Sequence, residues 1–235
     1  MPEVQKVVEE KELKEEVVQG VKQIEEAEID HLPNWIPKTG MGKAIKRGKI
    51  TSLEELWKMG KVIKEPEIID YFVHDLQERV LKTGRGKRPF KWVQRMTDSG
   101  RRNKYSVMVA IGDNKSFVGL GLGRAKEYGG AIASALRNAK LDIVFVKKGC
   151  GSWDCGCGAD HSIPVDSYGK SGSVTIILRP APKGAGIIAN NTTRDILELA
   201  GVKDVYSSTK GHTKTRSNLA KATFDALRSL SMIKQ

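Results

Sequence analysis

Long apolar runs and dispersed cysteines are both missing from this chain of 235 residues. No apolar run reaches the length of about eighteen residues that a membrane helix needs, so the sequence predicts no membrane partner. The N-terminal region is acidic and has no hydrophobic core segment, so we expect no secretory signal. All three cysteines lie between positions 150 and 157, which excludes a distributed disulfide framework. These absences favour a cytoplasmic protein.

Catalytic constellations are missing as well. The four histidines, at positions 31, 74, 161 and 212, stand in unrelated contexts. Neither a nucleophile-elbow motif nor a catalytic paired-carboxylate motif is found. We therefore expect no enzyme and no small-molecule substrate.

Negative charge is scarce outside the first thirty residues. The chain holds 40 Lys and Arg against 28 Asp and Glu, a net charge of +12. Ten acidic and four basic side chains fall within residues 1–30, so residues 31–235 carry a net charge of +18. A polyanion such as a nucleic acid is the expected partner of this basic part.

Residues 1–65 are predicted to be a charged N-terminal extension. Residues 1–30 indicate a solvated helix. Residues 31–66 are basic, contain glycine and hold few apolar anchors, which suits threading along a phosphate backbone, with a plain linker as the alternative. A short helix is expected to begin near Thr51–Glu55 and to end by Gly60.

Residues 66–142 predict a first folded domain. Its expected elements are a helix from Pro66 to Gly84, strands at Phe90–Met96, Tyr105–Gly112 and Ser116–Leu122, and a helix at Lys126–Leu141. Helix, three antiparallel strands and helix is the order of a double-stranded-RNA-binding domain, although other α+β folds share it.

Residues 143–235 predict a second domain with a Cys-rich insert at 149–161. Its expected elements are strands at 142–149, Ile163–Tyr168, Val174–Leu178 and Lys203–Tyr206, a helix from Asn190 or Thr192 to Gly201, and a helix at Thr215–Ser229.

Basic side chains gather in clusters that suit contact with phosphate groups. The first is the predicted hairpin tip Asp98–Lys104, where two arginines follow a glycine; a solvated hairpin end is the alternative. The candidate RNA-binding residues are Gly100, Arg101, Arg102 and Lys104 at the tip, Arg85, Lys87, Arg88 and Lys91 before it, Lys43, Lys46 and Arg47 in the extension, and Arg124 and Lys126. Glycines 119, 121 and 123 indicate close packing or a bulge rather than a nucleotide fingerprint.

The segment Gly184–Ala189 matches the pattern G-x-G-x-x-A between a strand and a helix. A loop and helix start of this kind point backbone N–H groups at an anion, and Asp204 follows at the distance of a ribose-binding carboxylate. Pro180 and Pro182 argue against a dinucleotide, because they separate the strand from the glycines. A nucleotide-dependent enzyme using this loop is kept as an alternative.

Four potential metal ligands lie within twelve residues: Cys150, Cys155, Cys157 and His161. Three thiolates and one imidazole can surround zinc tetrahedrally in a structural site. The spacing C-x4-C-x-C-x3-H lacks the usual C-x2-C pair. Three reduced thiols, or one disulfide, are therefore alternatives to a single structural zinc ion.

Three stretches together resemble the universal family of small-subunit ribosomal protein five. GRRNKYSVMVAIGDNKSFVGLGLGRAKE (100–127) resembles its first domain, and SVTIILRPAPKGAGIIANNTTRDILELAGVKDVYSSTKG (173–211) resembles its second. NLAKATFDALRSL (218–230) is similar to its closing helix. The acidic extension and the cysteines resemble the archaeal branch. The resemblance covers residues 66–230.

This resemblance implies an α+β fold, with a double-stranded-RNA-binding-like domain followed by a small α/β domain that has a left-handed βαβ crossover. It implies a structural protein of the small ribosomal subunit that binds 16S rRNA and supports translational accuracy. The family lies beside the channel through which mRNA enters and contacts small-subunit protein four. The loop expected at that protein contact holds Arg179, Pro180, Lys183, Gly184 and Gly186. A free-standing double-stranded-RNA-binding regulator is a further alternative.

Overall fold

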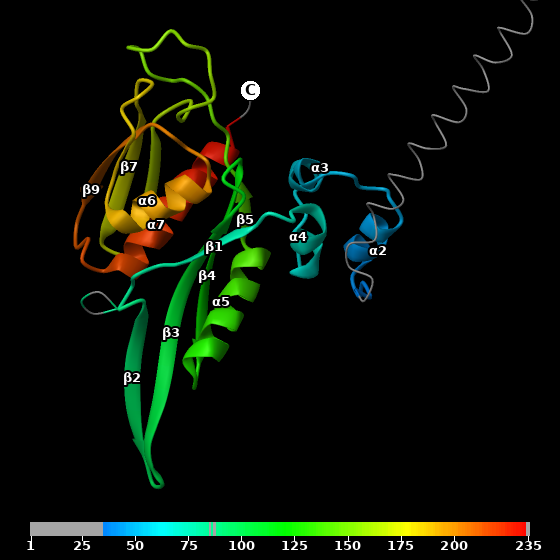
Figure 1. Cartoon of the computed structure of the whole chain (residues 1–235), viewed down its shortest axis with the longest axis vertical. Helices are drawn as coiled ribbons and strands as arrows, with labels where there is room; N and C mark the ends of the chain where they lie inside the picture. The colour runs from blue at the N-terminus through cyan, green and yellow to red at the C-terminus, as the bar shows by residue number, and fades with distance from the viewer. Residues whose placement is uncertain (1–34, 85, 87, 234–235) are drawn as a thin grey trace, which may run out of the picture. The chain divides into compact units, whose positions relative to one another are not determined.

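The computed structural model describes residues 35–84, 86 and 88–233, and Figure 1 shows their arrangement. The helix predicted within residues 1–30 lies outside this described part. Thr39–Gln235 forms one compact unit, which contains two β-sheets and their helices. None of the helices described has the length and hydrophobicity that crossing a membrane requires.

The first sheet has five strands, all antiparallel to their neighbours. The order across it is β1, β3, β4 and β5, and β2 pairs with the same edge of β3 as β1. The bounds are Gln77–Val80 for β1, Phe90–Thr97 for β2, Gly100–Gly112 for β3, Phe117–Ala125 for β4 and Ile143–Phe145 for β5. The three strands predicted between positions 90 and 122 are confirmed, and β5 lies within the strand predicted at 142–149.

Helix α5 (Tyr128–Leu141) covers one face of this sheet, and small residues let the two backbones approach closely. The buried alanines of the helix are Ala131, Ala135 and Ala139, and the glycines of β4 that face them are Gly119, Gly121 and Gly123. A Cβ atom added at Gly121 would collide with the carbonyl oxygen of Ala135. The alternating glycines thus serve close packing, as predicted.

The helix predicted from Pro66 to Gly84 is wrong beyond Phe72. Helix α4 covers Glu67–Phe72, and the following Gln77–Val80 is the edge strand β1. The apolar spacing from Ile68 to Val80 fits a helix. However, the free edge of β3 offers these four residues a backbone ladder, and a non-local partner of this kind overrides local periodicity.

The hairpin tip predicted as a loop at Asp98–Lys104 is mostly strand. The ladder between β2 and β3 continues until Thr97 lies opposite Gly100, so the turn consists of Asp98 and Ser99. Gly100 has φ +107°, a conformation that side-chain-bearing residues rarely adopt. In Figure 1 the hairpin extends well past α5. The strand geometry therefore fixes which face each basic side chain occupies.

The second sheet has four strands in the order β6, β7, β9, β8. The bounds are Ser167–Ser171 for β6, Val174–Pro180 for β7, Ile187–Ile188 for β8 and Val205–Lys210 for β9, with helices α6 at Asn191–Leu199 and α7 at Arg216–Ser231. The strand expected at Ile163–Tyr168 begins four residues later, and the strand expected at Lys203–Tyr206 begins two residues later. The two helices agree with the prediction.

Strands β8 and β9 are parallel, and α6 connects them. This βαβ unit fits the mixed α/β second domain that was expected. Helix α7 lies against β6, where a Cβ atom at Gly169 would collide with the carbonyl oxygen of Ala222. A close backbone approach thus joins helix and sheet in both halves of the fold.

The two sheets share one apolar core. Met108 and Leu120 from the first sheet belong to the same buried cluster as Ile176 from the second sheet, Leu197 from α6 and Phe224 from α7. Burial of this kind is worth about 1.5–3 kcal/mol for each large apolar side chain. The relative placement of the sheets is therefore stabilised mainly by hydrophobic contact.

The segment before the first sheet folds, contrary to the expectation of few apolar anchors. It forms α2 (Gly40–Lys46) and α3 (Leu53–Lys58), and buries Ile45 and Leu56 with only 1% of each exposed. The helix start predicted near Thr51–Glu55 is confirmed, because the Ser52 hydroxyl accepts from the backbone N–H of Glu55. Short helices with buried isoleucine and leucine define a packed subregion rather than a linker.

Candidate nucleic-acid interface and metal centre

The β2–β3 hairpin has two chemically different faces. In an antiparallel ladder, residues directly opposite each other point to the same side. One face carries basic residues from three adjacent strands, because Lys91 pairs with Ser106, and Ser106 pairs in turn with Arg124 on β4. The basic residues of this face are Lys91, Arg95, Arg102, Lys104 and Arg124, and all five are exposed. We name it the basic face.

The opposite face of the hairpin carries aromatic and apolar side chains. Trp92 and Met96 are 46% and 69% exposed, and Arg101 lies directly opposite Met96. Nearer the sheet, Phe90 packs against Tyr105 and Tyr128 with ring centroids 5.6 and 5.1 Å apart. We name this the aromatic face. Arg101 and Arg102 are neighbours in the sequence but lie on opposite faces.

The loop before the hairpin is closed by a side chain from the second half of the fold. The guanidinium of Arg216 donates to the carbonyl oxygens of Lys82 and Gly86, at 3.1 and 2.6 Å. Arg88 is exposed in this loop. Arg85 and Lys87, also predicted to bind RNA, lie outside the described residues.

The other predicted RNA-binding residues occupy separate elements. Lys43 and Lys46 belong to α2, Arg47 caps that helix, and all three are exposed. Lys126 is exposed in the turn between β4 and α5. The strand ladder thus joins the hairpin residues and Arg124, whereas Lys43, Lys46 and Arg47 form a cluster of their own.

The glycine loop between β7 and β8 does hold an anion, and that anion is a side chain of the protein. One carboxylate oxygen of Asp204 accepts hydrogen bonds from the backbone N–H groups of Gly184 and Gly186, at 3.1 and 2.8 Å. Both glycines have positive φ, which turns their N–H groups inward. This loop belongs to the predicted protein contact, in which Arg179 and Lys183 are exposed.

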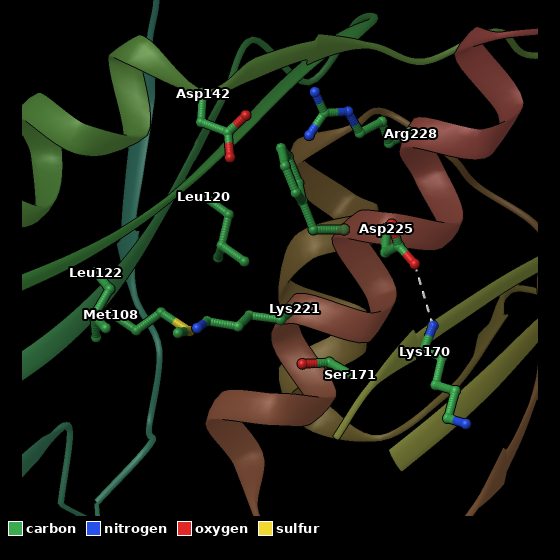
Figure 2. Close-up of a pocket in the computed structure, with 10 residues that line it drawn as sticks. Met108, Leu120, Leu122, Asp142, Lys170, Ser171, Lys221, Asp225 and Arg228 are labelled. Carbon is green, nitrogen blue, oxygen red and sulfur yellow. Dashed lines mark hydrogen bonds between the residues drawn. The ribbon is translucent and has the colours of Figure 1, made fainter. Parts of the chain in front are cut away.

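This geometry argues against the nucleotide-binding alternative. Asp204 would have to be available for a ribose, yet it is 95% buried and bonded to the loop itself. A cleft of the fold lies elsewhere, between the first sheet and α7, as Figure 2 shows. It is lined by Met108, Leu120, Leu122, Asp142, Lys170, Ser171, Lys221, Phe224, Asp225 and Arg228. No residue of the 184–189 segment contributes to it.

The four predicted metal ligands meet in space. The sulfur atoms of Cys150, Cys155 and Cys157 and a ring nitrogen of His161 all lie within 4.8 Å of one another. In a tetrahedral zinc site the sulfur–nitrogen edge is about 3.6 Å, which follows from the usual bond lengths. The Cys155 sulfur lies 3.7 Å from His161 Nε2, and all three cysteines are free thiols. The donor set and its spacing therefore fit zinc, and the disulfide alternative does not describe this structure.

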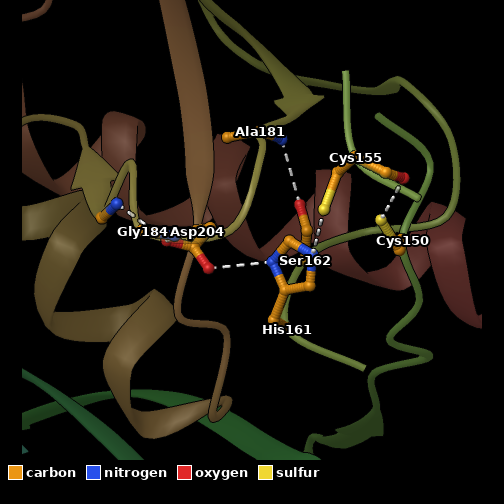
Figure 3. A network of polar contacts seen from close by, with 8 residues as sticks. Cys150, Cys155, His161, Ser162, Ala181, Gly184 and Asp204 are labelled. Carbon is orange, nitrogen blue, oxygen red and sulfur yellow. Dashed lines mark hydrogen bonds and ion pairs between the residues drawn. The ribbon is translucent and has the colours of Figure 1, made fainter. Parts of the chain in front are cut away.

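His161 is held in the orientation that a metal ligand needs. Its Nδ1 lies 2.8 Å from the second carboxylate oxygen of Asp204, and both side chains are buried. When Nδ1 carries the proton and donates a hydrogen bond to the carboxylate, Nε2 presents its lone pair to the cysteines. Figure 3 shows the ring standing between Asp204 on one side and Cys155 on the other.

Local hydrogen bonds tune the acidity of these groups. The backbone N–H of Lys183, followed by the thiol of Cys157, lowers the pKa of Cys155 to about 6. Partial burial and the neighbouring thiols raise the pKa of Cys150. Burial acts to raise the pKa of Asp204, but the N–H groups of Gly186 and Gly184 and the ring of His161 outweigh it and lower that pKa. At neutral pH the site thus offers a thiolate at Cys155 and a carboxylate behind His161.

Two positioning residues escaped prediction from the sequence. The sequence pattern suggests a ribose as the partner of Asp204, whereas its partner in the structure, His161, lies 43 residues away. Arg216 was not singled out, although it closes the 82–88 loop from 130 residues away or more. No local pattern carries either signal, because both contacts depend on how the sheets pair.

Comparison with known proteins agrees with this architecture. The family model described as Ribosomal protein S5, N-terminal domain, matches residues 76–147, and that described as Ribosomal protein S5, C-terminal domain, matches residues 169–235. The metal-ligand segment lies between the two matched ranges.

Curated relatives extend the match to most of the chain. Small ribosomal subunit protein uS5 of Staphylothermus marinus is 48% identical over 197 residues, which cover 84% of this chain and 89% of the relative. The proteins of the same name from Ignicoccus hospitalis and Methanospirillum hungatei are 48% and 46% identical, over 83% and 85% of this chain and 89% and 94% of their own lengths. Since both family models match in order and archaeal relatives cover more than four fifths of the sequence, this chain belongs to the ribosomal protein S5 family, archaeal type.

Proposed function

We propose that this chain is a non-enzymatic structural component of the small subunit of the cytoplasmic ribosome, where it binds 16S rRNA. Its relatives are named as small-subunit proteins, and the family is a structural one. The observation that carries rRNA binding is the basic face, which presents five exposed cations on three adjacent strands. Guanidinium and ammonium groups form strong charge-assisted hydrogen bonds with phosphate oxygens, and several of them together give salt-dependent binding to a nucleic acid.

The aromatic face gives the hairpin a second mode of contact. Unpaired bases stack on exposed aromatic rings, and arginine adds a planar cation that stacks as well. Trp92 provides the ring and Arg101 the planar cation on one side of the ribbon, where the exposed Met96 lies opposite Arg101. We assign phosphate contact to the basic face and base contact to the aromatic face.

Two further contacts complete the proposed function. The segment from Arg179 to Gly186 contacts small-subunit protein four, and the chain lies beside the channel through which mRNA enters, where it supports decoding accuracy. The support for both is family membership together with the exposed position of Arg179 and Lys183. The division into domains at 66–142 and 143–235 stays a prediction.

Salt-dependent binding tests the rRNA proposal. The full-length protein is co-sedimented with small subunits depleted of this protein, over a series of salt concentrations. We expect steep weakening with salt, and a loss of about 10–100-fold at low salt for the double variant Arg95→Ala/Arg102→Ala. The slope of log K against log salt should fall by about two units.

A matched double variant removes the same amount of charge elsewhere. Lys64 and Arg137 are exposed and lie off the hairpin, so Lys64→Ala/Arg137→Ala should leave affinity and slope unchanged. Equal losses in both double variants would contradict the assignment to the basic face. Binding to free double-stranded RNA but not to subunits would instead favour a regulator outside the ribosome.

We also propose that Cys150, Cys155, Cys157 and His161 hold one structural zinc ion. The supporting observation is the convergence of three sulfur atoms and one imidazole nitrogen within 4.8 Å. Zinc would cross-link a glycine-rich segment that contains no helix. Elemental analysis of the native protein should find one zinc per chain. Absence of metal together with three titratable thiols would end this proposal.

A further inference from the structure

Asp204 contacts both His161 and the glycine loop, which lie far apart in the sequence. One of its oxygens contacts Nδ1 of His161 at 2.8 Å, and the other accepts the N–H groups of Gly184 and Gly186. The carboxylate is 95% buried, so water does not compete freely for these bonds. The orientation of one buried group therefore affects both the histidine and the glycine loop.

Backbone contacts reinforce the same connection. The carbonyl oxygen of His161 accepts from the N–H groups of both Lys203 and Asp204, at 3.0 and 3.1 Å. The hydroxyl of Ser162 accepts from the N–H of Ala181 at 3.1 Å. The end of the Cys-rich segment is thus hydrogen-bonded to the residues just before β9 and to the start of the glycine loop (Figure 3).

Few other bonds hold the loop. Its backbone forms one internal hydrogen bond, from Ala185 to Pro182 at 3.2 Å, and the carbonyl oxygen of Gly186 accepts from the N–H of Val205 at 3.1 Å, whereas Lys183 and Gly184 are exposed. This stretch contains two glycines with positive φ, and because glycine loses more conformational entropy than other residues, ordering the loop is costly in free energy. Its shape therefore depends on the group that accepts two of its N–H donors, the carboxylate of Asp204.

A metal ion would fix this carboxylate through His161. Coordination would draw Nε2 of the histidine toward the ion. Because Nδ1 of the same ring then donates to Asp204, the carboxylate would be locked in the position that receives Gly184 and Gly186. This arrangement of metal, histidine and carboxylate would transmit metal occupancy to a loop that contains no metal ligand.

We propose that Asp204 couples the zinc centre to the loop Pro182–Gly186, so that zinc occupancy determines whether this loop is ordered. The inference rests on the zinc site proposed above. It adds a role for Asp204 and a function for the metal. The ion orders the loop Pro182–Gly186, in addition to cross-linking the segment 150–161 that holds its ligands.

Amide hydrogen exchange in the full-length protein tests the coupling. Exchange at Gly184 and Gly186 is compared between the zinc-loaded protein and the same protein after removal of zinc by a chelator. We expect removal to increase exchange at both glycines at least about 10-fold, equivalent to about 1.4 kcal/mol. The amides of Val109 and Leu120, which lie in the buried ladder of the first sheet, serve as controls and should not change.

A pair of aspartate variants tests the role of Asp204 directly. Asp204→Asn removes the charge that accepts from His161, and should weaken zinc binding by about 10–100-fold. Asp160→Asn makes the same chemical change at an exposed aspartate next to His161 and should leave zinc affinity unaltered. If Asp204→Asn does not fold, the exchange measurement on the parent protein still decides the question.

The outcomes separate the two proposals. One zinc per chain with unchanged exchange at Gly184 and Gly186 after its removal overturns the coupling and leaves the zinc site standing. So does zinc binding by Asp204→Asn that is as tight as in the parent protein. Faster exchange at every amide, controls included, also overturns it, because the metal would then support the whole fold. A protein that binds no zinc overturns both proposals.

Discussion

Arg79 of the edge strand β1 lies 3.1 Å from the carboxylate of Asp195 on α6, so the first sheet is tied to a helix of the second half of the fold. The same guanidinium lies 2.5 Å from Glu198, one turn further along that helix. These groups are between 31% and 42% exposed, so solvent screens the attraction. The two ion pairs help to determine where β1 attaches.

Replacing Arg79 by methionine should therefore destabilise the protein modestly. We expect the free energy of unfolding to fall by about 1 kcal/mol at low salt and by less at high salt, because surface ion pairs weaken with ionic strength. Urea titrations at two salt concentrations measure this. Arg137→Met, on the exposed side of α5, is the control and should be neutral. A loss that is independent of salt would show that Arg79 acts by packing instead.

Two glycine substitutions should have opposite effects. Gly121→Ala places a methyl group against the carbonyl oxygen of Ala135, and overpacking of this kind costs about 1–3 kcal/mol. Gly129→Ala lies in the first turn of α5 with no atom within 4 Å of the new Cβ, and should stabilise the protein by about 0.5 kcal/mol. Thermal unfolding of both variants decides this. Equal effects would contradict the close approach of α5 to β4.

Asp142 should make stability depend on pH. Partial burial raises the pKa of its carboxyl group, and the charge of Arg228, which faces it across the cleft in Figure 2, offsets this only in part. The folded state therefore holds its proton to a higher pH than the unfolded chain does. Its contribution to stability is fully present below about pH 4, the unfolded value, and is lost as pH rises through the folded pKa.

The variant Asp142→Asn removes this titration. We expect the variant to be more stable than the parent at pH 7, by less than about 1 kcal/mol because the side chain keeps contact with solvent. The difference should vanish below about pH 4, where the parent side chain is also neutral. Denaturant titrations between pH 3 and pH 8 measure it. A difference that does not change over this range would show that the Asp142 charge has no role.

Elements whose stabilising contacts are local could be predicted from the sequence. The serine cap at Ser52, the alternating run of β7 and the apolar stripe of α7 each carry their own signal in consecutive residues. The convergence of Cys150, Cys155, Cys157 and His161 could be predicted as well, because these residues lie within twelve positions of each other in the sequence.

Elements that depend on distant partners could not be predicted in this way. Gln77–Val80 continues an apolar spacing that fits a helix, and only the free edge of β3 makes it a strand. Asp204 follows the glycines at a spacing that suggests a ribose contact, and only the fold shows that its carboxylate serves the loop and His161. In both cases the deciding interaction joins residues more than fifteen positions apart, which local periodicity cannot encode.

The two faces of the hairpin should respond differently to mutation. Trp92→Ala removes a surface on which a base can stack, and should weaken binding to small subunits by about 10-fold without changing the dependence on salt. Arg102→Ala removes a phosphate contact on the other face, and should lower the slope of log K against log salt by about one unit. Val93→Ala, 49% exposed on the basic face, trims a side chain that provides neither contact and should bind normally.

Circular dichroism of each variant checks that the hairpin still folds. Since register alone places Trp92 and Arg102 on opposite sides, a change of slope in Trp92→Ala, or none in Arg102→Ala, would contradict the assignment of bases to one face and phosphates to the other.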